Sequence, residues 1–231
     1  MTEPKSNSLI ARLPRVDRLR LLDRCTLVAL PVDHVVQEPA SSTRQVYFPV
    51  DSSIALVESL DGKPCLQVGM IGSEGMLGGE VALGVARAPL HAVVQGAGSA
   101  WRVRTADFRA ELESSSALRR SVQRYLYVLM GQAAATAACV NFHLIGPRLA
   151  SWMLMSQARA HSPSFHMTHE FLAHKMGVRR GGITTAAKLL QQQGLIAYSR
   201  GDVMILDRKG LIAASCGCFA KGQSNYARVL H

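Results

Sequence analysis

The 231-residue chain lacks any run of eighteen apolar residues, the length at which a segment becomes a candidate membrane-spanning helix. The first residues, Met1–Leu13, are polar and lack the apolar core of a secretory signal peptide. The sequence also contains no recognisable Ser-His-Asp set, carboxylate pair or phosphate-binding glycine loop. We therefore expect a cytoplasmic protein that does not bind membranes, and nothing in the sequence argues for an enzyme.

Cysteine is scarce, with five residues in the chain. They are scattered and odd in number, which in a cytosolic chain favours reduced thiols over a disulfide framework. The closest pair, Cys216 and Cys218, is separated by one residue rather than the two of the usual CxxC metal motif. His143 has no evident partner ligand in the sequence and is interpreted as a hydrogen-bonded or solvated side chain. We expect no metal site and interpret all five cysteines as structural or surface thiols: Cys25, Cys65, Cys139, Cys216 and Cys218.

Acidic residues are also in deficit, with 16 Asp and Glu against 26 Lys and Arg and a formal net charge of +10. The imbalance is concentrated at one end of the chain. Residues 147–231 contain eleven basic and three acidic residues, whereas residues 1–146 contain fifteen and thirteen. Such a concentration of positive charge is typical of a surface that meets phosphates. Because no strongly amphipathic basic helix accompanies it, we expect nucleic acid rather than a membrane as the partner.

The segment from Thr168 to Asp207 has the pattern of two short helices followed by a β-hairpin. Thr168 is a helix-capping residue, and Gly177 stands where the first helix is expected to end. A second helix fits from about Arg179 to Gln192, and short strands fit residues 195–197 and 203–206. Two helices joined by a glycine turn and followed by a wing can place one helix in the major groove of DNA. The second helix would turn four apolar residues inward: Ile183, Ala186, Ala187 and Leu190.

The segment from about Cys139 to Phe219 resembles the C-terminal half of Crp/Fnr-type bacterial transcription regulators. The matching pieces are RLASWMLM at 148–155, THEFLAHKMGV at 168–178, AAKLLQQQGLI at 186–196, YSRGDVMILDRKGL at 198–211 and CGCF at 216–219. The resemblance implies a winged helix that binds double-stranded DNA as a homodimer, and it admits RNA polymerase as a further partner. The helix near 179–192 would be the recognition helix.

The recognition helix departs from the better-known pattern of this family. Those members usually carry Glu and Arg at two positions where this chain has Gly181 and Thr185, while Arg180 is kept. We therefore expect an operator that differs from the common one. Arg180, Thr184 and Thr185 are expected to contact bases. Arg179 and Lys188 are expected to contact phosphates, and the remaining residues expected at the DNA surface are Thr168, Arg200 and Gly201.

Residues 27–103 consist of short apolar runs separated by turns, a pattern that favours an antiparallel barrel or jelly roll. Within it, Asp61-Gly62 is a hairpin signal. The pieces VYFPVDSSIALVES at 46–59 and VGMIGSEGMLGGEVALG at 68–84 resemble the cyclic-nucleotide-binding-type domain of the same family. In its nucleotide-binding members, a Gly-Glu pair and a later Arg-Ser or Arg-Thr pair hold the ribose and the cyclic phosphate.

This chain matches only the first of those two pairs. Gly79 and Glu80 fit the Gly-Glu pair, but Pro89-Leu90 stands at the second position, and Arg87 is the nearest cation. We therefore expect a regulator that is not activated by cyclic AMP, with an unidentified small-molecule effector or none, and we expect no cofactor. Two alternatives stay open: a cyclic-nucleotide-activated regulator that uses Glu80 and Arg87, and a sensor that acts through protein partners.

A long helix without proline is expected over about 114–142. Leu118, Val122, Tyr125 and Leu129 recur along it at spacings of three and four, and the resemblance favours a seam with a second copy. The alternative is that this face packs on the chain's own barrel. The combined prediction is an α+β chain with a β-roll sensor at 1–113, a dimerisation helix and hinge at 114–146, and a winged helix-turn-helix at 147–231.

Overall fold

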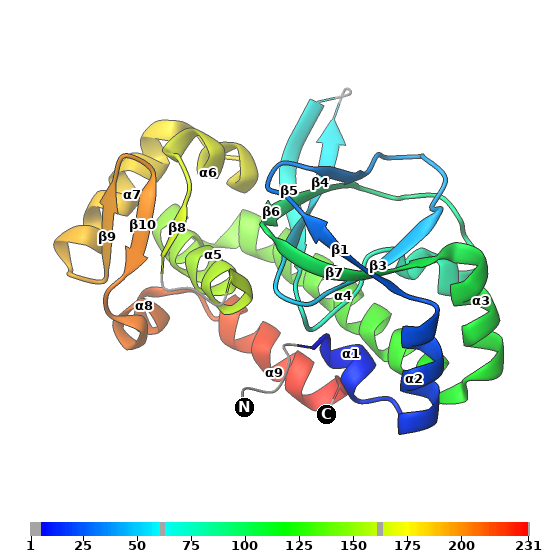
Figure 1. Cartoon of the computed structure of the whole chain (residues 1–231). Helices are drawn as coiled ribbons and strands as arrows, with labels where there is room; N and C mark the ends of the chain where they lie inside the picture. Colours follow the sequence, from blue (N-terminus) through cyan, green and yellow to red (C-terminus); the bar gives the residue numbers. More distant parts are fainter. Residues whose placement is uncertain (1–5, 61–62, 161–163, 231) are drawn as a thin grey trace. The chain divides into compact units, whose positions relative to one another are not determined.

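The computed structural model describes residues 6–60, 63–160 and 164–230 (Figure 1). The chain forms two compact units. The N-terminal unit takes in the residues up to Val57, then Gly69–Met130 and Leu230, and the C-terminal unit takes in Glu58–Val68 and Gly131–Val229. Within the described ranges, no helix is both long enough and apolar enough to cross a membrane.

The N-terminal unit begins with two short helices, α1 (Ser8–Ala11) and α2 (Arg15–Asp23). A short 3-10 helix, η1 (Gly79–Leu83), precedes the last two strands of the unit, and helix α3 (Thr105–Ser114) follows them. The strands are β1 (Thr26–Leu30), β2 (Val35–Gln37), β3 (Gln45–Pro49), β4 (Ser53–Leu60), β5 (Lys63–Ile71), β6 (His91–Gly96) and β7 (Gly98–Arg104).

These strands form two sheets, with the orders β1-β7-β3 and β2-β6-β4-β5. Strands β1 and β3 pair antiparallel with β7, and β2 and β4 pair antiparallel with β6. The predicted Asp61-Gly62 turn lies outside the described residues. Both sheets contribute to one apolar core, which confirms the predicted antiparallel β-roll; its buried members are Leu30, Ile54, Ile71, Leu77, Ala92, Val94 and Ala100.

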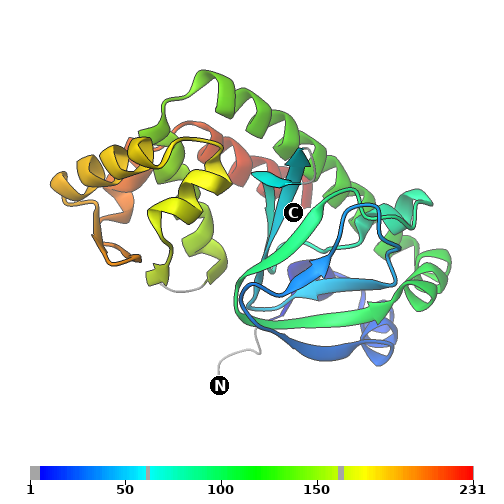
Figure 2. The same ribbon diagram turned by 90° about the horizontal axis from the view of Figure 1, so that it is seen from above.

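Helix α4 (Ser116–Phe142) is one uninterrupted helix (Figure 2). Its inner face packs on the N-terminal unit: Leu118, Val122 and Tyr125 have exposed fractions of 1%, 0% and 0%. The hydroxyl of Tyr125 donates a hydrogen bond to the carbonyl oxygen of Met76, at 3.2 Å. A Cβ atom at Gly75 would collide with the Tyr125 ring, so this contact needs a glycine.

This packing corrects the predicted dimer seam. Leu118, Val122 and Tyr125 are buried against the chain's own unit and are unavailable to a second copy. Leu129, the fourth predicted seam residue, is half-buried on the same side. The three-and-four spacing was read correctly as a buried face, but spacing alone does not distinguish an internal partner from an external one.

The C-terminal unit places a three-stranded sheet of order β8-β10-β9 beside a group of helices. Helix α5 packs against α7 and α8, and α6 packs against α7. Pro147 lies in the first turn of α5, where a missing N–H leaves no hydrogen bond unmade. The elements are α5 (Ile145–Ala160), β8 (Ser164–His166), α6 (His169–Met176), α7 (Arg180–Gln192), β9 (Ile196–Ser199), β10 (Asp202–Ile205), α8 (Arg208–Ala214) and α9 (Cys218–Leu230).

Candidate nucleic-acid interface

Helix α6 begins and ends as the sequence predicts. The Oγ1 atom of Thr168 accepts a hydrogen bond from the backbone N–H of Phe171, at 3.1 Å, and so caps the first turn. Gly177 follows the last turn at φ 62°, in the left-handed region that glycine enters without steric cost. Thr168 was predicted to contact DNA, but its side-chain oxygen already accepts the capping hydrogen bond from Phe171.

Helix α7 has two unlike faces. The predicted inward residues, Ile183, Ala186, Ala187 and Leu190, are all buried, with exposed fractions of 5% or less. This confirms the periodicity read from the sequence. The opposite face carries the basic and hydroxyl side chains predicted to contact DNA, and all of them are exposed: Arg179, Arg180, Thr184, Thr185 and Lys188.

His169, which sequence reasoning left without a specific role, connects three elements of the C-terminal unit. Its ring stacks on Tyr198 of β9, with ring centroids 4.4 Å apart. Its Nδ1 lies 3.0 Å from the Oγ1 of Thr184, and the Thr184 hydroxyl donates a hydrogen bond to the carbonyl oxygen of Arg180, at 3.1 Å. Burial, and then the charge of Arg180, lower the pKa of His169, which favours the neutral ring. Thr184 is therefore held in place by its neighbours within the protein.

The two glycines in the first turn of α7 have different surroundings. A Cβ atom at Gly182 would lie 2.6 Å from Cδ1 of Ile145, so Gly182 allows α7 to approach α5 closely. A Cβ atom at Gly181 would meet nothing within 4 Å. Arg179, at the N-cap position, makes no side-chain capping hydrogen bond. The first turn of α7 thus presents exposed backbone beside two arginines.

The β9–β10 hairpin turns through two residues, Arg200 and Gly201, since Ser199 and Asp202 pair directly. Both turn residues have positive φ values, 50° and 94°, which is the geometry of a type I′ turn. A Cβ atom at Gly201 would lie 2.6 Å from Cε1 of His166. That histidine is fixed by Asp202, with 2.8 Å between Nδ1 and Oδ1. The wing tip therefore presents the exposed Arg200 on a defined turn.

In the N-terminal unit, the predicted effector residues Gly79 and Glu80 lie at the start of η1. An oxygen of Glu80 accepts hydrogen bonds from the Thr43 hydroxyl, at 2.5 Å, and from Nε2 of Gln37, at 3.0 Å. A Cβ atom at Gly79 would lie 2.9 Å from Cδ2 of Leu126 in α4. Both residues thus have internal structural partners.

Arg87 does not point inward as the alternating geometry of a strand could have allowed. Its side chain is exposed, and the following residue, Ala88, is the buried one, with an exposed fraction of 3%. Backbone pairing of this segment with the neighbourhood of Ser42 fixes that alternation. In this conformation the exposed Arg87 side chain is not part of the buried interior of the roll.

The cysteines are less scattered in space than in sequence. Cys139, Cys216 and Cys218 lie together with His143, which corrects their interpretation as unrelated thiols. The missed signal was the spacing of Cys139 and His143, four residues apart at the end of one helix and so on one face. Cys25 belongs to the N-terminal unit, and burial, followed by the charge of Glu111, raises the pKa of its thiol to about 12. The side chain of Cys65 lies outside the described residues.

The sequence and the fold both resemble known proteins. Residues 147–214 match the Crp-like helix-turn-helix domain. No curated protein sequence matches the chain. A Crp/Fnr-family transcriptional regulator from Eubacterium rectale is 14% identical with a TM-score of 0.68, covering 89% of this chain and 96% of its own. FixK2 from Bradyrhizobium japonicum is 13% identical with a TM-score of 0.68, covering 83% and 98%. A CRP-family regulator from Thermus thermophilus is 18% identical with a TM-score of 0.67, covering 81% and 97%.

At these identities the solved structures establish the fold, while the domain match identifies the C-terminal module from its sequence. That module is of a DNA-binding kind rather than a catalytic one. Residues 147–214 therefore form a Crp-like helix-turn-helix domain, and the chain has the fold of the Crp/Fnr-type transcription regulators.

Proposed function

We propose that the chain is a cytoplasmic, homodimeric transcription regulator of the Crp/Fnr type that reads duplex DNA through the exposed face of α7. The two-sided character of α7 carries this proposal: one face is buried, and the other presents three cations and two hydroxyls on a well-packed helix. The charge supports it, because the excess of basic residues lies in the same part of the chain. Recognition helices contact bases mainly through the residues near their N-termini.

The exposed residues divide by position into base readers and phosphate contacts. Arg180 stands at the first position of α7, where its guanidinium can reach the two acceptors of a guanine. Thr185 is the second base reader, while Thr184 acts as a positioning residue through His169. Arg179, Lys188 and Arg200 contact phosphates, and the open backbone at Gly181 admits a phosphate beside the helix N-terminus.

Salt dependence tests this proposal directly. Three phosphate contacts per protomer give six per dimer, which predicts a slope of about −5 for log K against log salt concentration. Binding should then weaken about a thousandfold between 50 and 200 mM salt. Fluorescence anisotropy with a duplex that contains the operator measures this slope. A flat response would favour the alternative in which the winged helix is a surface for protein partners.

The dimer contact is proposed for the outer face of α4, opposite the buried residues. Tyr127 and Met130 are exposed there, with exposed fractions of 63% and 72%. The same face continues at heptad spacing through the exposed residues Ala134, Ala137 and Asn141. Apolar side chains at successive a and d positions, followed by small residues, are suited to close packing of two parallel helices. Such a pair would set two recognition helices about 34 Å apart, one turn of DNA.

We infer that cyclic AMP is not the effector. Glu80, which would have to hold the ribose, already accepts hydrogen bonds from Thr43 and Gln37, and the side chain of Arg87 is exposed. Loss of a buried charged partner costs about 2–5 kcal/mol, more than tenfold in affinity. Calorimetric titration with cyclic AMP and cyclic GMP tests this inference. Micromolar binding that is abolished by both Glu80→Gln and Arg87→Ala would favour the cyclic-nucleotide-activated alternative.

A further inference from the structure

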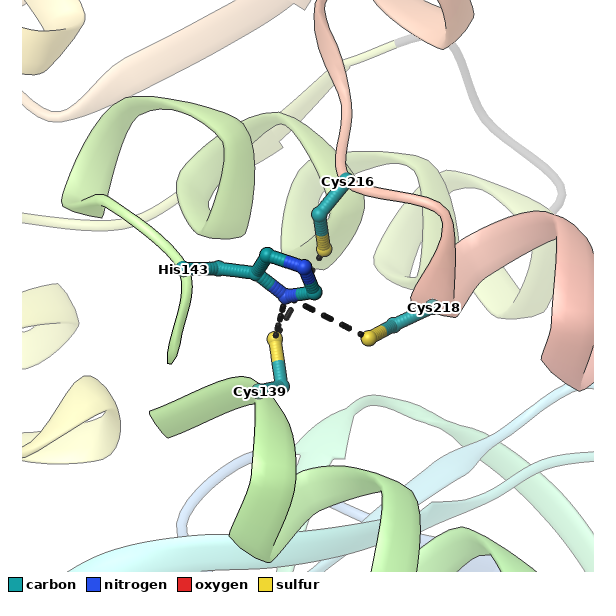
Figure 3. A group of neighbouring side chains, drawn as sticks. All are labelled: Cys139, His143, Cys216 and Cys218. Atoms are coloured by element: carbon teal, nitrogen blue, oxygen red, sulfur yellow. Dashed lines mark hydrogen bonds between the residues drawn. The ribbon is translucent and has the colours of Figure 1, made fainter. Parts of the chain in front are cut away.

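Four side chains that the DNA-binding proposal does not use meet at one point in the C-terminal unit (Figure 3). We call this set the thiol-imidazole cluster: Cys139, His143, Cys216 and Cys218. Cys139 lies in the last turn of α4 and His143 directly follows that helix. Cys216 lies between α8 and α9, and Cys218 is the first residue of α9. One ligand atom from each residue lies within 4.8 Å of all the others.

Three of the separations within the cluster match those of ligands around a single tetrahedral ion, and the remaining ones are no longer than 4.8 Å. Zn–S bonds of about 2.3 Å and Zn–N bonds of about 2.0–2.1 Å require S···S separations of about 3.8 Å and S···N separations of about 3.6 Å. The Sγ atoms of Cys139 and Cys216 are 3.6 Å apart. Nδ1 of His143 lies 3.5 Å from Sγ of Cys139 and 3.6 Å from Sγ of Cys218. Each of these three separations is within about 0.2 Å of the tetrahedral value.

The chemistry of the donors narrows the choice of ion. Three thiolates and one imidazole form the Cys₃His set of structural zinc sites, whereas Mg²⁺ and Ca²⁺ prefer oxygen ligands. An iron–sulfur cluster distributes its thiolates over several irons, which spreads the ligating sulfurs further apart than this compact arrangement. A disulfide requires an S–S distance of about 2.05 Å, so Cys139 and Cys216 are reduced thiols here.

The surroundings of Cys216 resemble the outer shell of a metal site. Its Sγ lies 3.0 Å from the hydroxyl oxygen of Ser151 in α5. Its backbone N–H donates to the carbonyl oxygen of Pro147, at 3.2 Å. The residue is buried, with an exposed fraction of 6%. Hydrogen bonds of this kind orient a ligating sulfur before the ion arrives, and their loss typically weakens metal binding.

We propose that Cys139, His143, Cys216 and Cys218 bind one divalent ion of the zinc class in tetrahedral coordination. Binding converts the three thiols to thiolates, so three protons leave for the solvent as the ion enters. The site joins the end of α4 to the segment between α8 and α9, and through Ser151 it touches α5. It therefore spans the break between α4 and α5, at His143 and Leu144.

This position gives the ion a regulatory consequence, which rests on the proposed DNA-binding function. A bound ion would fix the end of the dimerisation helix relative to the helices that support α7. The metal-loaded protein is then expected to bind its operator more tightly than the metal-free protein. Metal binding itself does not depend on DNA, so failure of one proposal is distinguishable from failure of the other.

The first experiment measures metal on the full-length, reduced protein. Elemental analysis after addition of Zn²⁺ and removal of excess should give one ion per chain. Substitution with Co²⁺ should give the intense visible bands of tetrahedral cobalt, with thiolate-to-cobalt charge transfer in the near ultraviolet. Calorimetry in buffers of different ionisation enthalpy should show proton release on binding. A stoichiometry near zero, or a spectrum of octahedral cobalt without charge transfer, overturns the proposal.

Variants distinguish metal binding at the thiol-imidazole cluster from unspecific metal binding by thiols elsewhere in the chain. Cys218→Ser and His143→Ala should each weaken Zn²⁺ affinity by on the order of a hundredfold or more, and Ser151→Ala by roughly ten- to hundredfold. Cys25→Ser and His34→Ala are matched controls outside the cluster and should retain one ion per chain. Far-ultraviolet circular dichroism checks that the variants are folded. If a variant does not fold, the cobalt spectrum of the unmodified chain still tests the proposal. Full affinity in both Cys218→Ser and His143→Ala, or a Cys139–Cys216 disulfide in the freshly reduced protein, overturns the assignment.

Discussion

Replacement of Arg180 by alanine is expected to weaken operator binding by about 1–3 kcal/mol for each half-site of the dimer, roughly five- to 150-fold per half-site. Arg180 is the first residue of α7, its side chain is exposed, and the helix beneath it is fixed by the buried Ile183 and Ala187. A guanidinium in that position can donate two hydrogen bonds to one guanine. The expected loss is therefore confined to sequences with guanine at the contacted position, and a substituted operator should bind both proteins equally weakly.

The structure supplies a second readout for Arg180 that requires no DNA. Burial is the main cause that lowers the pKa of His169, and the charge of Arg180 is the second. Arg180→Ala should therefore raise the pKa of His169 partway toward its usual value, as measured by NMR titration of the ring. This shift would show that the Arg180 guanidinium occupies the position on which the base contact depends.

The assay is a comparison of anisotropy titrations over operator variants at fixed salt. Lys188→Ala, at a predicted phosphate contact, should weaken binding equally on all sequences and reduce the salt slope by about 2 for the dimer. Arg109→Ala, an exposed arginine of α3, removes the same charge from the N-terminal unit and should change neither quantity. An equal loss on every sequence for Arg180→Ala would refute its role as a base reader.

Three further predictions address the dimer, the wing and the pH dependence. Met130→Asp should convert the dimer to a monomer in light scattering at micromolar concentration. Leu83, with an exposed fraction of 66%, lies outside α4, so Leu83→Asp should leave the dimer intact. A monomeric unmodified chain would contradict the proposed contact. Gly201→Ala should lower the free energy of unfolding by about 1–2 kcal/mol, because φ is 94° and His166 is close. Gly181→Ala should raise the free energy of unfolding by about 0.5–1 kcal/mol, because a Cβ atom there meets nothing. Thermal unfolding measures both, and equal effects would argue against this turn geometry. The lowered pKa of His169 means that the unfolded state binds its proton first, so stability falls as the pH drops below about 6.5. This fall should be shallower in His169→Gln, and identical melting-temperature profiles would count against it.

The winged-helix segment was predictable because its signals are local. The Thr168 cap, the Gly177 turn and the inward residues of α7 each depend on neighbours within a few positions. Helix period and capping chemistry therefore determine them before any tertiary contact forms. The same reasoning identified the exposed face of α7, since the residues that do not turn inward on a supported helix remain outside.

The features that escaped prediction depend on partners distant in sequence. The inner face of α4 is apolar at helical spacing whether it meets the chain's own roll or a second copy. The burial of Leu118, Val122 and Tyr125 and the Tyr125–Met76 hydrogen bond decide between them, and both depend on the folded roll. Cys139 and Cys216 are 77 residues apart, so the two local pairs, Cys139 with His143 and Cys216 with Cys218, do not show from sequence that they meet. The role of His169, in α6, depends on the ring of Tyr198, which lies in β9 and stacks on it.

The wing turn carries a consequence for any effort to stabilise this protein. At φ 50°, Arg200 occupies a conformation that asparagine or glycine adopts readily and that other residues adopt at a cost of about 1–2 kcal/mol. Selection for thermal stability alone would therefore replace this residue early. The same substitution would remove the cation from the tip of the hairpin. The chain thus keeps a long charged side chain where backbone preference favours a short one, and stability and DNA affinity should change in opposite directions at this position.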